Sequence, residues 1–197
     1  MYKNKKIFFL VLIVVVILYF LYHEGKYQLE LMDSPFDNFT WSEFDSGAMP
    51  DEVLNPDIPT HMNKSGKWLL TGSGEENMDF DFVSDLDKIR NNVGFAIPVT
   101  PGNGYRSDRY NKKVNGVSDS SHRRKGVAKV KAADLSLNSY AKKKAVAQAA
   151  IELGITRFGW GNGTLLHIDN DETKSQNVVW GYGGSHPSFN DLEQNLA

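Results

Sequence analysis

Cysteine is missing from all 197 residues of the chain. Its absence excludes disulfide frameworks, zinc sites built on thiolates, and cysteine nucleophiles. An excess of one charge is missing too, because 22 lysines and arginines stand against 24 aspartates and glutamates. With a formal net charge of −2, the chain is not built to bind polyanions over its whole surface, and we expect no nucleic-acid partner. The sequence contains no internal repeat and no long low-complexity segment.

Charge is also absent from one long stretch near the N-terminus, residues 7–22, which is apolar throughout. Such a stretch covers most of a hydrocarbon layer of about 30 Å. No small-x-small cleavage site follows it, which favours an uncleaved signal anchor over 1–25 rather than a cleaved signal peptide. Lysines at positions 3, 5 and 6 favour a cytoplasmic N-terminus. We therefore expect a single-pass membrane protein whose remaining chain is extracytoplasmic, on the periplasmic or cell-wall side.

After the anchor, a polar stretch at 26–38 predicts a short stalk, and 39–197 predicts one domain. Its first part, up to residue 74, is rich in turn formers. Periodicity then predicts helices over 78–94 and 139–154, with a shorter helix within 104–116. Alternating apolar residues predict strands at 95–100, 131–137, 155–162, 164–170 and 177–182. This irregular mixture predicts a small α+β domain with a central antiparallel sheet flanked by helices.

Three polar residues stand out as candidates for chemistry. His167 and Asp169 are two apart on a predicted strand, so their side chains point to the same face. Such a pair is common in metal sites, but on its own it is more often ordinary surface. Asp134 enters a strand beside two alanines, where a partly buried carboxylate needs a charged partner or a metal. Together, His122, Asp134 and His167 offer two imidazoles and one carboxylate, a set suited to a catalytic zinc with one position open for water.

Six segments follow one another in an order that resembles a known family. They are WSEFDSG, the helix ending DKIRNNVG, FAIPVTPGNGYRS, NKKVNGVSDSSH, FGWGNGTLLHIDND and VVWGY. Together they resemble the zinc-dependent peptidases of family M15, which include D-alanyl-D-alanine carboxypeptidases and phage endolysin peptidases. The resemblance extends from Phe39 to Tyr182, and six ordered segments are far more specific than any one of them. It implies that 39–197 is an M15-like peptidase domain with a Zn²⁺ cofactor.

The resemblance also implies roles for individual residues. The zinc ligands would be His122, Asp134 and His167. Arg106 would be a catalytic residue beside the site, where its guanidinium can hold a peptide carboxylate. Ser120 would help to bind substrate. Asp169 would be either the general base or the group that orients His167. Other branches of the family carry an acid at the position of Thr164, which cannot serve as a base.

Two insertions separate the chain from the family pattern. Eleven residues lie between His122 and Asp134, more than in the family's H-x-x-G-x-A-x-D, and TPGNGYRS is longer than the family's TSGYRS. Loop closure depends only weakly on length, so the two ends of the longer loop can still meet. The basic residues of this loop fit either a solvated loop or a contact with acidic wall polymer or lipid.

Two functions are consistent with these features. The first is a membrane-anchored zinc peptidase, bacterial or phage, that hydrolyses peptidoglycan stem peptides as a D-Ala-D-Ala carboxypeptidase or as an endopeptidase of the endolysin type. The alternative is a catalytically inactive module with the same fold that binds the cell wall, its metal chemistry lost through the insertions. Zinc content and hydrolysis of sacculi would distinguish the two.

Overall fold

The computed structural model describes residues 19, 34–47, 61–62, 68–69 and 74–194. The chain divides into two compact units, 1–40 and 41–197. In the described part of the first unit, the Ser34 hydroxyl donates to the Phe39 carbonyl at 2.5 Å. The predicted anchor lies outside the described residues except for Tyr19. Within the residues described, we find no helix that is both long enough and apolar enough to cross a membrane.

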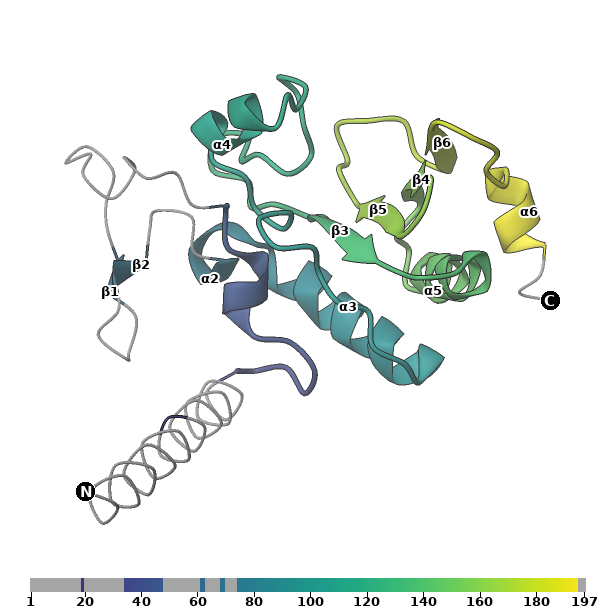
Figure 1. Ribbon diagram of the computed structural model, residues 1–197, viewed down its shortest axis with the longest axis horizontal. Coiled ribbons are helices and arrows are strands. Elements are labelled where there is room, and N and C mark those ends of the chain that lie inside the picture. Colours follow the sequence, from purple (N-terminus) through teal and green to yellow (C-terminus); the bar gives the residue numbers. More distant parts are fainter. Residues whose placement is uncertain (1–18, 20–33, 48–60, 63–67, 70–73, 195–197) are drawn as a thin grey trace, which may run out of the picture. The chain divides into compact units, whose positions relative to one another are not determined.

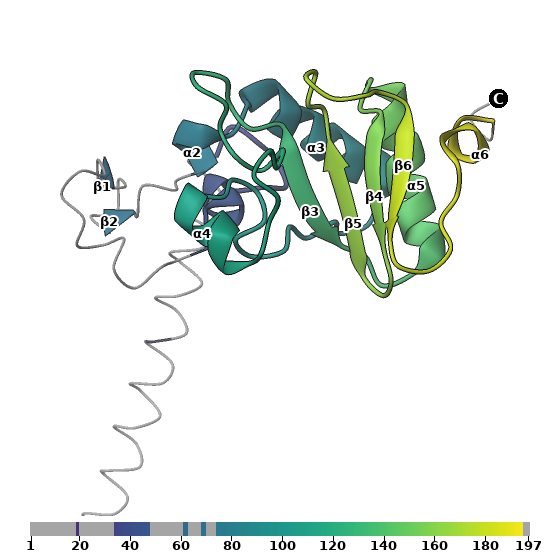
Figure 2. The ribbon, with the colours of Figure 1, turned by 90° about the horizontal axis from the view of Figure 1, so that it is seen from above.

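The second unit contains the elements shown in Figures 1 and 2. Its helices are η1 (Trp41–Phe44), α2 (Gly74–Asn77), α3 (Phe80–Val93), α4 (Asp108–Lys113), α5 (Tyr140–Glu152) and α6 (Phe189–Glu193). Its strands are β1 (His61–Met62), β2 (Trp68–Leu69), β3 (Ala132–Ser136), β4 (Arg157–Gly161), β5 (Leu165–Asp169) and β6 (Val178–Tyr182). Strands β1 and β2 pair with each other, and the remaining four form a separate sheet. The α+β class predicted from the sequence is therefore confirmed.

The four-stranded sheet has the order β3-β5-β4-β6. Strand β5 is antiparallel to both β3 and β4, but β6 runs parallel to β4. The prediction of an antiparallel sheet is therefore wrong at this edge. Asp169 at the end of β5 pairs with Arg157 at the start of β4. The short loop 170–177 passes this end of the sheet and starts β6 there, beside the start of β4, so β4 and β6 must run in the same direction.

The predicted strand at 95–100 is also wrong. The structure has only an isolated bridge there, between Val99 and Leu135. The Ser136 amide donates to the Pro98 carbonyl, and the Thr100 amide donates to the Asp134 carbonyl. Prolines at 98 and 101 have no N–H group to donate, so a regular ladder cannot extend along this segment. The segment instead runs beside β3 as an irregular loop.

Helices α3 and α5 lie together on one side of the sheet (Figure 2). The Asp79 side chain caps α3 by accepting from the Phe82 amide, and Gly94 ends the helix with a φ of 69°. Alternate residues of the strands point toward these helices and are fully buried. They include Leu135, Leu166, Ile168 and Phe158. Polar side chains are therefore gathered on the opposite face of the sheet.

Candidate metal centre

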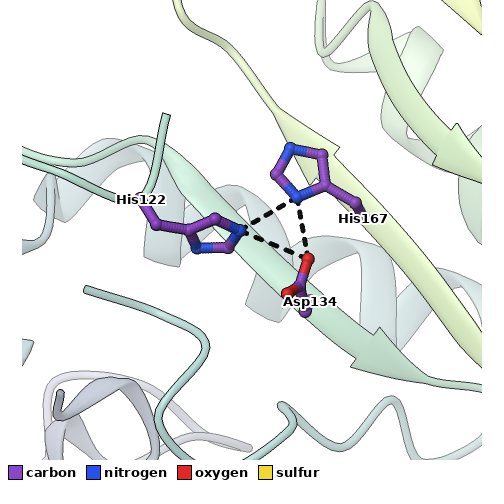
Figure 3. Close-up of side chains that lie close together, drawn as sticks. All are labelled: His122, Asp134 and His167. Carbon is purple, nitrogen blue, oxygen red and sulfur yellow. Dashed lines mark hydrogen bonds and ion pairs between the residues drawn. The ribbon is translucent and has the colours of Figure 1, made fainter. Parts of the chain in front are cut away.

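The strand register places two of the predicted ligands side by side. Asp134 on β3 pairs directly with His167 on β5, and His167 pairs with Gly159 on β4. Paired residues on neighbouring strands point to the same face, so both side chains leave the sheet on the side away from the helical core. His122 comes from the loop between α4 and β3, and its carbonyl accepts from the Arg106 amide at 2.8 Å. Figure 3 shows the three side chains converging.

The three candidate ligand atoms form a compact triangle. His167 Nδ1 lies 2.8 Å from Asp134 Oδ1, and His122 Nε2 lies 3.0 Å from His167 Nδ1. The third side, from His122 Nε2 to Asp134 Oδ1, is 3.3 Å. Ligand atoms about 2.0–2.1 Å from a tetrahedral zinc lie about 3.3 Å from one another. All three residues are buried, and the donor set fits one face of a tetrahedral zinc site.

Each of the three side chains is held on its other side by a second contact. His122 Nδ1 bonds the Gly104 carbonyl at 2.7 Å, and His167 Nε2 bonds Asp169 Oδ2 at 2.8 Å. An Arg106 guanidinium nitrogen donates to Asp134 Oδ2 at 2.5 Å. Such contacts fix the ring orientation and the tautomer of metal-binding histidines. They leave His122 Nε2, His167 Nδ1 and Asp134 Oδ1 facing one another.

Asp169 is fully buried, and both of its carboxylate oxygens are engaged. Oδ1 accepts from Arg157 Nε at 2.7 Å and from the Asp171 amide at 3.0 Å, while Oδ2 contacts His167. A general base must reach the proton of a water molecule or a substrate group. Of the two roles predicted for Asp169, these contacts favour the orientation of His167.

Arg106 and Ser120 lie beside the triangle but make contacts within the protein. Arg106 donates to Asp134 and, through the same nitrogen, to the Asn103 side chain. Its buried Nε has no hydrogen-bond partner among the residues that the structure describes. The Ser120 hydroxyl accepts from the His122 amide at 3.3 Å and so supports the turn that carries His122. Substrate binding by these two residues stays a prediction.

The titratable groups of the cluster shift one another's pKa values. Burial lowers the pKa of His122 below its usual range, although Asp134 opposes the shift. Burial also acts to lower the pKa of His167, but hydrogen bonds to Asp134 and Asp169 outweigh it and raise the pKa to about 9. Burial acts to raise the pKa of Asp134, yet the two imidazoles hold it well below its ordinary value. Two ionised carboxylates therefore favour a proton on His167, and a metal ion bound at its Nδ1 would replace that proton.

Residues that the sequence analysis did not single out line the β4–β6 side of the cluster. A Cβ atom at Gly159 would lie 2.6 Å from the Tyr182 ring, 2.9 Å from the His167 Cβ and 3.0 Å from the Trp180 ring. Only glycine therefore leaves room for all three side chains as they lie. The Trp180 and His167 rings are 5.4 Å apart, and Tyr182 beyond Trp180 is half exposed. The strand register places His167, Gly159 and Trp180 in one row across β5, β4 and β6. The sequence could have pointed to this row only if the parallel pairing of β6 with β4 had been known.

The basic residues of the inserted loop, residues 123–133, make contacts with other parts of the chain. Arg123 contacts Asp108, Lys125 contacts Asp171 and Lys131 contacts Glu172, at 2.6 to 2.8 Å. Arg124 and Lys129 donate to the Asn77 side chain and the Glu75 carbonyl. These contacts use the basic groups to attach the loop to its neighbours. They do not favour the interpretation of this loop as a contact for acidic polymer or lipid.

A family model described as Peptidase M15 matches residues 60–169, which is more than half of the chain. The matched range contains His122, Asp134 and His167, and it confirms the resemblance seen in the sequence. The segments WSEFDSG and VVWGY lie outside it. Neither a curated protein nor a solved structure matches the chain.

Proposed function

The chain belongs to the M15 peptidase family, and we propose that it is a zinc-dependent enzyme that hydrolyses the stem peptides of peptidoglycan. The observation that carries the proposal is the triangle of His122 Nε2, His167 Nδ1 and Asp134 Oδ1, with sides of 2.8 to 3.3 Å. Three buried ligand atoms on one side leave the opposite side for water and substrate, as in catalytic zinc sites.

The residues of the chain would hold the ion and prepare the site. The Gly104 carbonyl and Asp169 keep each imidazole in the orientation that presents its other nitrogen to the metal. Arg106 holds Asp134 so that one carboxylate oxygen remains for the metal. The chemistry that zinc supplies when bound is activation of water near neutral pH and polarisation of a peptide carbonyl.

The surroundings of the triangle support a substrate that carries a carboxylate. Arg106 is a permanent positive charge at the edge of the site, and its buried Nε has no hydrogen-bond partner in the described part of the chain. A substrate group that reaches this guanidinium would be placed next to the metal. Such a contact suits a carboxypeptidase acting on D-Ala-D-Ala, while an endopeptidase would use Arg106 for a main-chain carbonyl.

The proposed location follows from the N-terminal segment. An anchor at 1–25 and a stalk at 26–38 would keep the peptidase domain on the extracytoplasmic face of the membrane, where peptidoglycan is accessible. In a bacterium this would be a resident wall enzyme. In a phage the same anchor would restrain an endolysin.

The test is the zinc content of the purified full chain in detergent, followed by incubation with purified sacculi. We expect one zinc per chain, with release of D-alanine or of stem fragments that stops after chelation and returns with zinc. Free D-alanine alone indicates a carboxypeptidase, and peptide fragments indicate an endopeptidase. Binding to sacculi without zinc and without release would instead favour the inactive wall-binding module. The closeness of the three ligand atoms argues against that alternative, which assumed that the insertions had separated them.

A further inference from the structure

The carboxylate of Asp171, in the segment after β5, contacts two residues of the loop that carries His122. Asp171 Oδ2 accepts from the Ser121 hydroxyl at 3.2 Å and from Lys125 Nζ at 2.6 Å. Ser121 directly precedes His122, and Lys125 follows it by three residues. One carboxylate oxygen therefore holds the chain on both sides of a candidate metal ligand.

Asp171 is itself firmly placed. Its Oδ1 accepts from the Thr173 amide at 3.1 Å and from the Thr173 hydroxyl at 2.6 Å. Its own amide donates to Asp169, which bonds His167. The side chain of Asp171 is only 10% exposed, so its contacts are partly shielded from solvent. Asp171 thus connects the segment that carries His122 to the residues that hold His167.

Because His122 lies beside the inserted loop and not on a strand, its position must be fixed by contacts such as those of Asp171. His167 and Asp134 are placed by neighbouring strands, whereas His122 lies in a loop separated from Asp134 by eleven residues. A longer loop closes at little extra cost, but a metal ligand must be held within about 0.5 Å of its position. Figure 2 shows the loop before β3 and the loop after β5 at the same end of the sheet, where Asp171 can join them.

We propose that Asp171 is a positioning residue of the metal centre, which holds His122 in place through Ser121 and Lys125. The inference rests on the proposed function, because it requires His122, Asp134 and His167 to bind one metal ion. Burial acts to raise the pKa of Asp171, but hydrogen bonds from Lys125 and Thr173 outweigh it and hold the pKa at about 2, so the carboxylate is ionised at neutral pH.

The chain offers a matched control at the next residue. Glu172 pairs with Lys131 at 2.8 Å and connects the same two segments. Its side chain is 76% exposed, however, and Lys131 lies at the β3 end of the loop, where its carbonyl already accepts from the Asn170 amide. Removing this pair changes the charge of the segment after β5, as Asp171→Asn does, without removing a contact of Ser121 or Lys125.

The experiment measures the zinc dissociation constant of the full chain in detergent by competition with a chromophoric chelator. We expect Asp171→Asn to weaken zinc binding about tenfold or more. Glu172→Gln should change it by no more than about twofold, as expected for an exposed ion pair. Unfolding of each metal-free variant by urea shows whether the loss of zinc affinity exceeds any general loss of structure.

A double-mutant cycle separates positioning from a local charge effect. Ser121→Ala combined with Lys125→Met should weaken zinc binding about as much as Asp171→Asn does, and adding Asp171→Asn to that pair should have little further effect. Equal dissociation constants for Asp171→Asn and Glu172→Gln would overturn the inference, as would full additivity in the cycle. If Asp171→Asn does not fold, Ser121→Ala and Lys125→Met alone give the same comparison with Glu172→Gln. A wild-type chain that binds no zinc would instead refute the proposed function, and this inference with it.

Discussion

The two halves of the candidate metal centre are built in different ways. Asp134 and His167 lie on paired strands, and the backbone ladder between β3 and β5 sets their separation. His122 lies on an inserted loop, and a few side-chain and backbone contacts set its position. Ladder hydrogen bonds form one cooperative unit with the core, whereas surface loops open locally at lower cost. The comparison indicates that Asp134 and His167, the sheet half of the centre, are held rigidly. His122, the loop half, completes the centre from the inserted loop.

The largest expected effect comes from removing one ligand from either half. Both His167→Ala and His122→Ala should abolish stoichiometric zinc binding, because two ligands do not form a stable catalytic site. Hydrolysis of sacculi should fall by on the order of a thousandfold or more, since the metal contributes several kcal/mol to the transition state. Metal analysis and product release by chromatography measure both quantities. Full activity of His122→Ala would mean that the loop half takes no part in the site.

The next largest effect concerns the support of the sheet half. Asp169→Asn should weaken zinc binding by about 10- to 100-fold, because His167 loses the carboxylate that orients it. It also leaves the buried guanidinium of Arg157 without its ionic partner, which should cost about 3–5 kcal/mol of unfolding free energy. Chelator competition and urea denaturation test the two effects. Unchanged zinc affinity and stability with a lost catalytic rate would instead make Asp169 the general base.

A smaller effect is expected at Gly159, where the sheet half admits no side chain. The added Cβ of Gly159→Ala would press against His167 and Trp180, and the unfolding free energy should fall by about 1–3 kcal/mol. Ser136→Ala, at an exposed site at the end of β3, is the matched control and should change stability by less than about 0.5 kcal/mol. Similar unfolding free energies of the two variants would show that the sheet can accommodate a Cβ at position 159, contrary to the short distances in the structure.

The smallest effect concerns pH and the loop half. The pKa of Asp171 is about 2 in the folded chain against an ordinary value of 3.8. A carboxyl group with a lowered folded pKa adds stability that is fully present above pH 3.8 and is lost as the pH falls through about 2. The difference in unfolding free energy between wild type and Asp171→Asn, both metal-free, should therefore shrink over this range. A difference that stays constant from pH 5 to pH 2 would be inconsistent with the lowered pKa.

The parts of the fold that could be predicted from the sequence depend on local signals. The helix ending at Gly94 has a capping aspartate, an apolar face and a C-terminal glycine within one short segment. The ligand set came from the resemblance to a family, and the structure brings those three residues together. The contact of His167 with Asp169 was one of two roles predicted for that residue. The second contacts of His122 and Asp134, with the Gly104 carbonyl and Arg106, could not be predicted, because they depend on how distant segments pack.

Pairing between strands is the other part that the sequence could not provide. Alternation in VVWGY predicts a strand, but it carries no information about which edge of the sheet the strand joins or in which direction it runs. The parallel pairing of β6 with β4 is what brings Trp180 into line with Gly159 and His167. The segment 95–100 has the composition of a strand, yet Pro98 and the following Pro101 limit it to a single bridge.

The most direct test of the account is the position of zinc in a crystal of the zinc-loaded chain, measured by anomalous diffraction at the zinc edge. The account predicts one strong peak about 2.0–2.2 Å from His122 Nε2, His167 Nδ1 and Asp134 Oδ1. A peak bound by Asp134 and His167 with His122 turned away, or no peak at this face of the sheet, would contradict it.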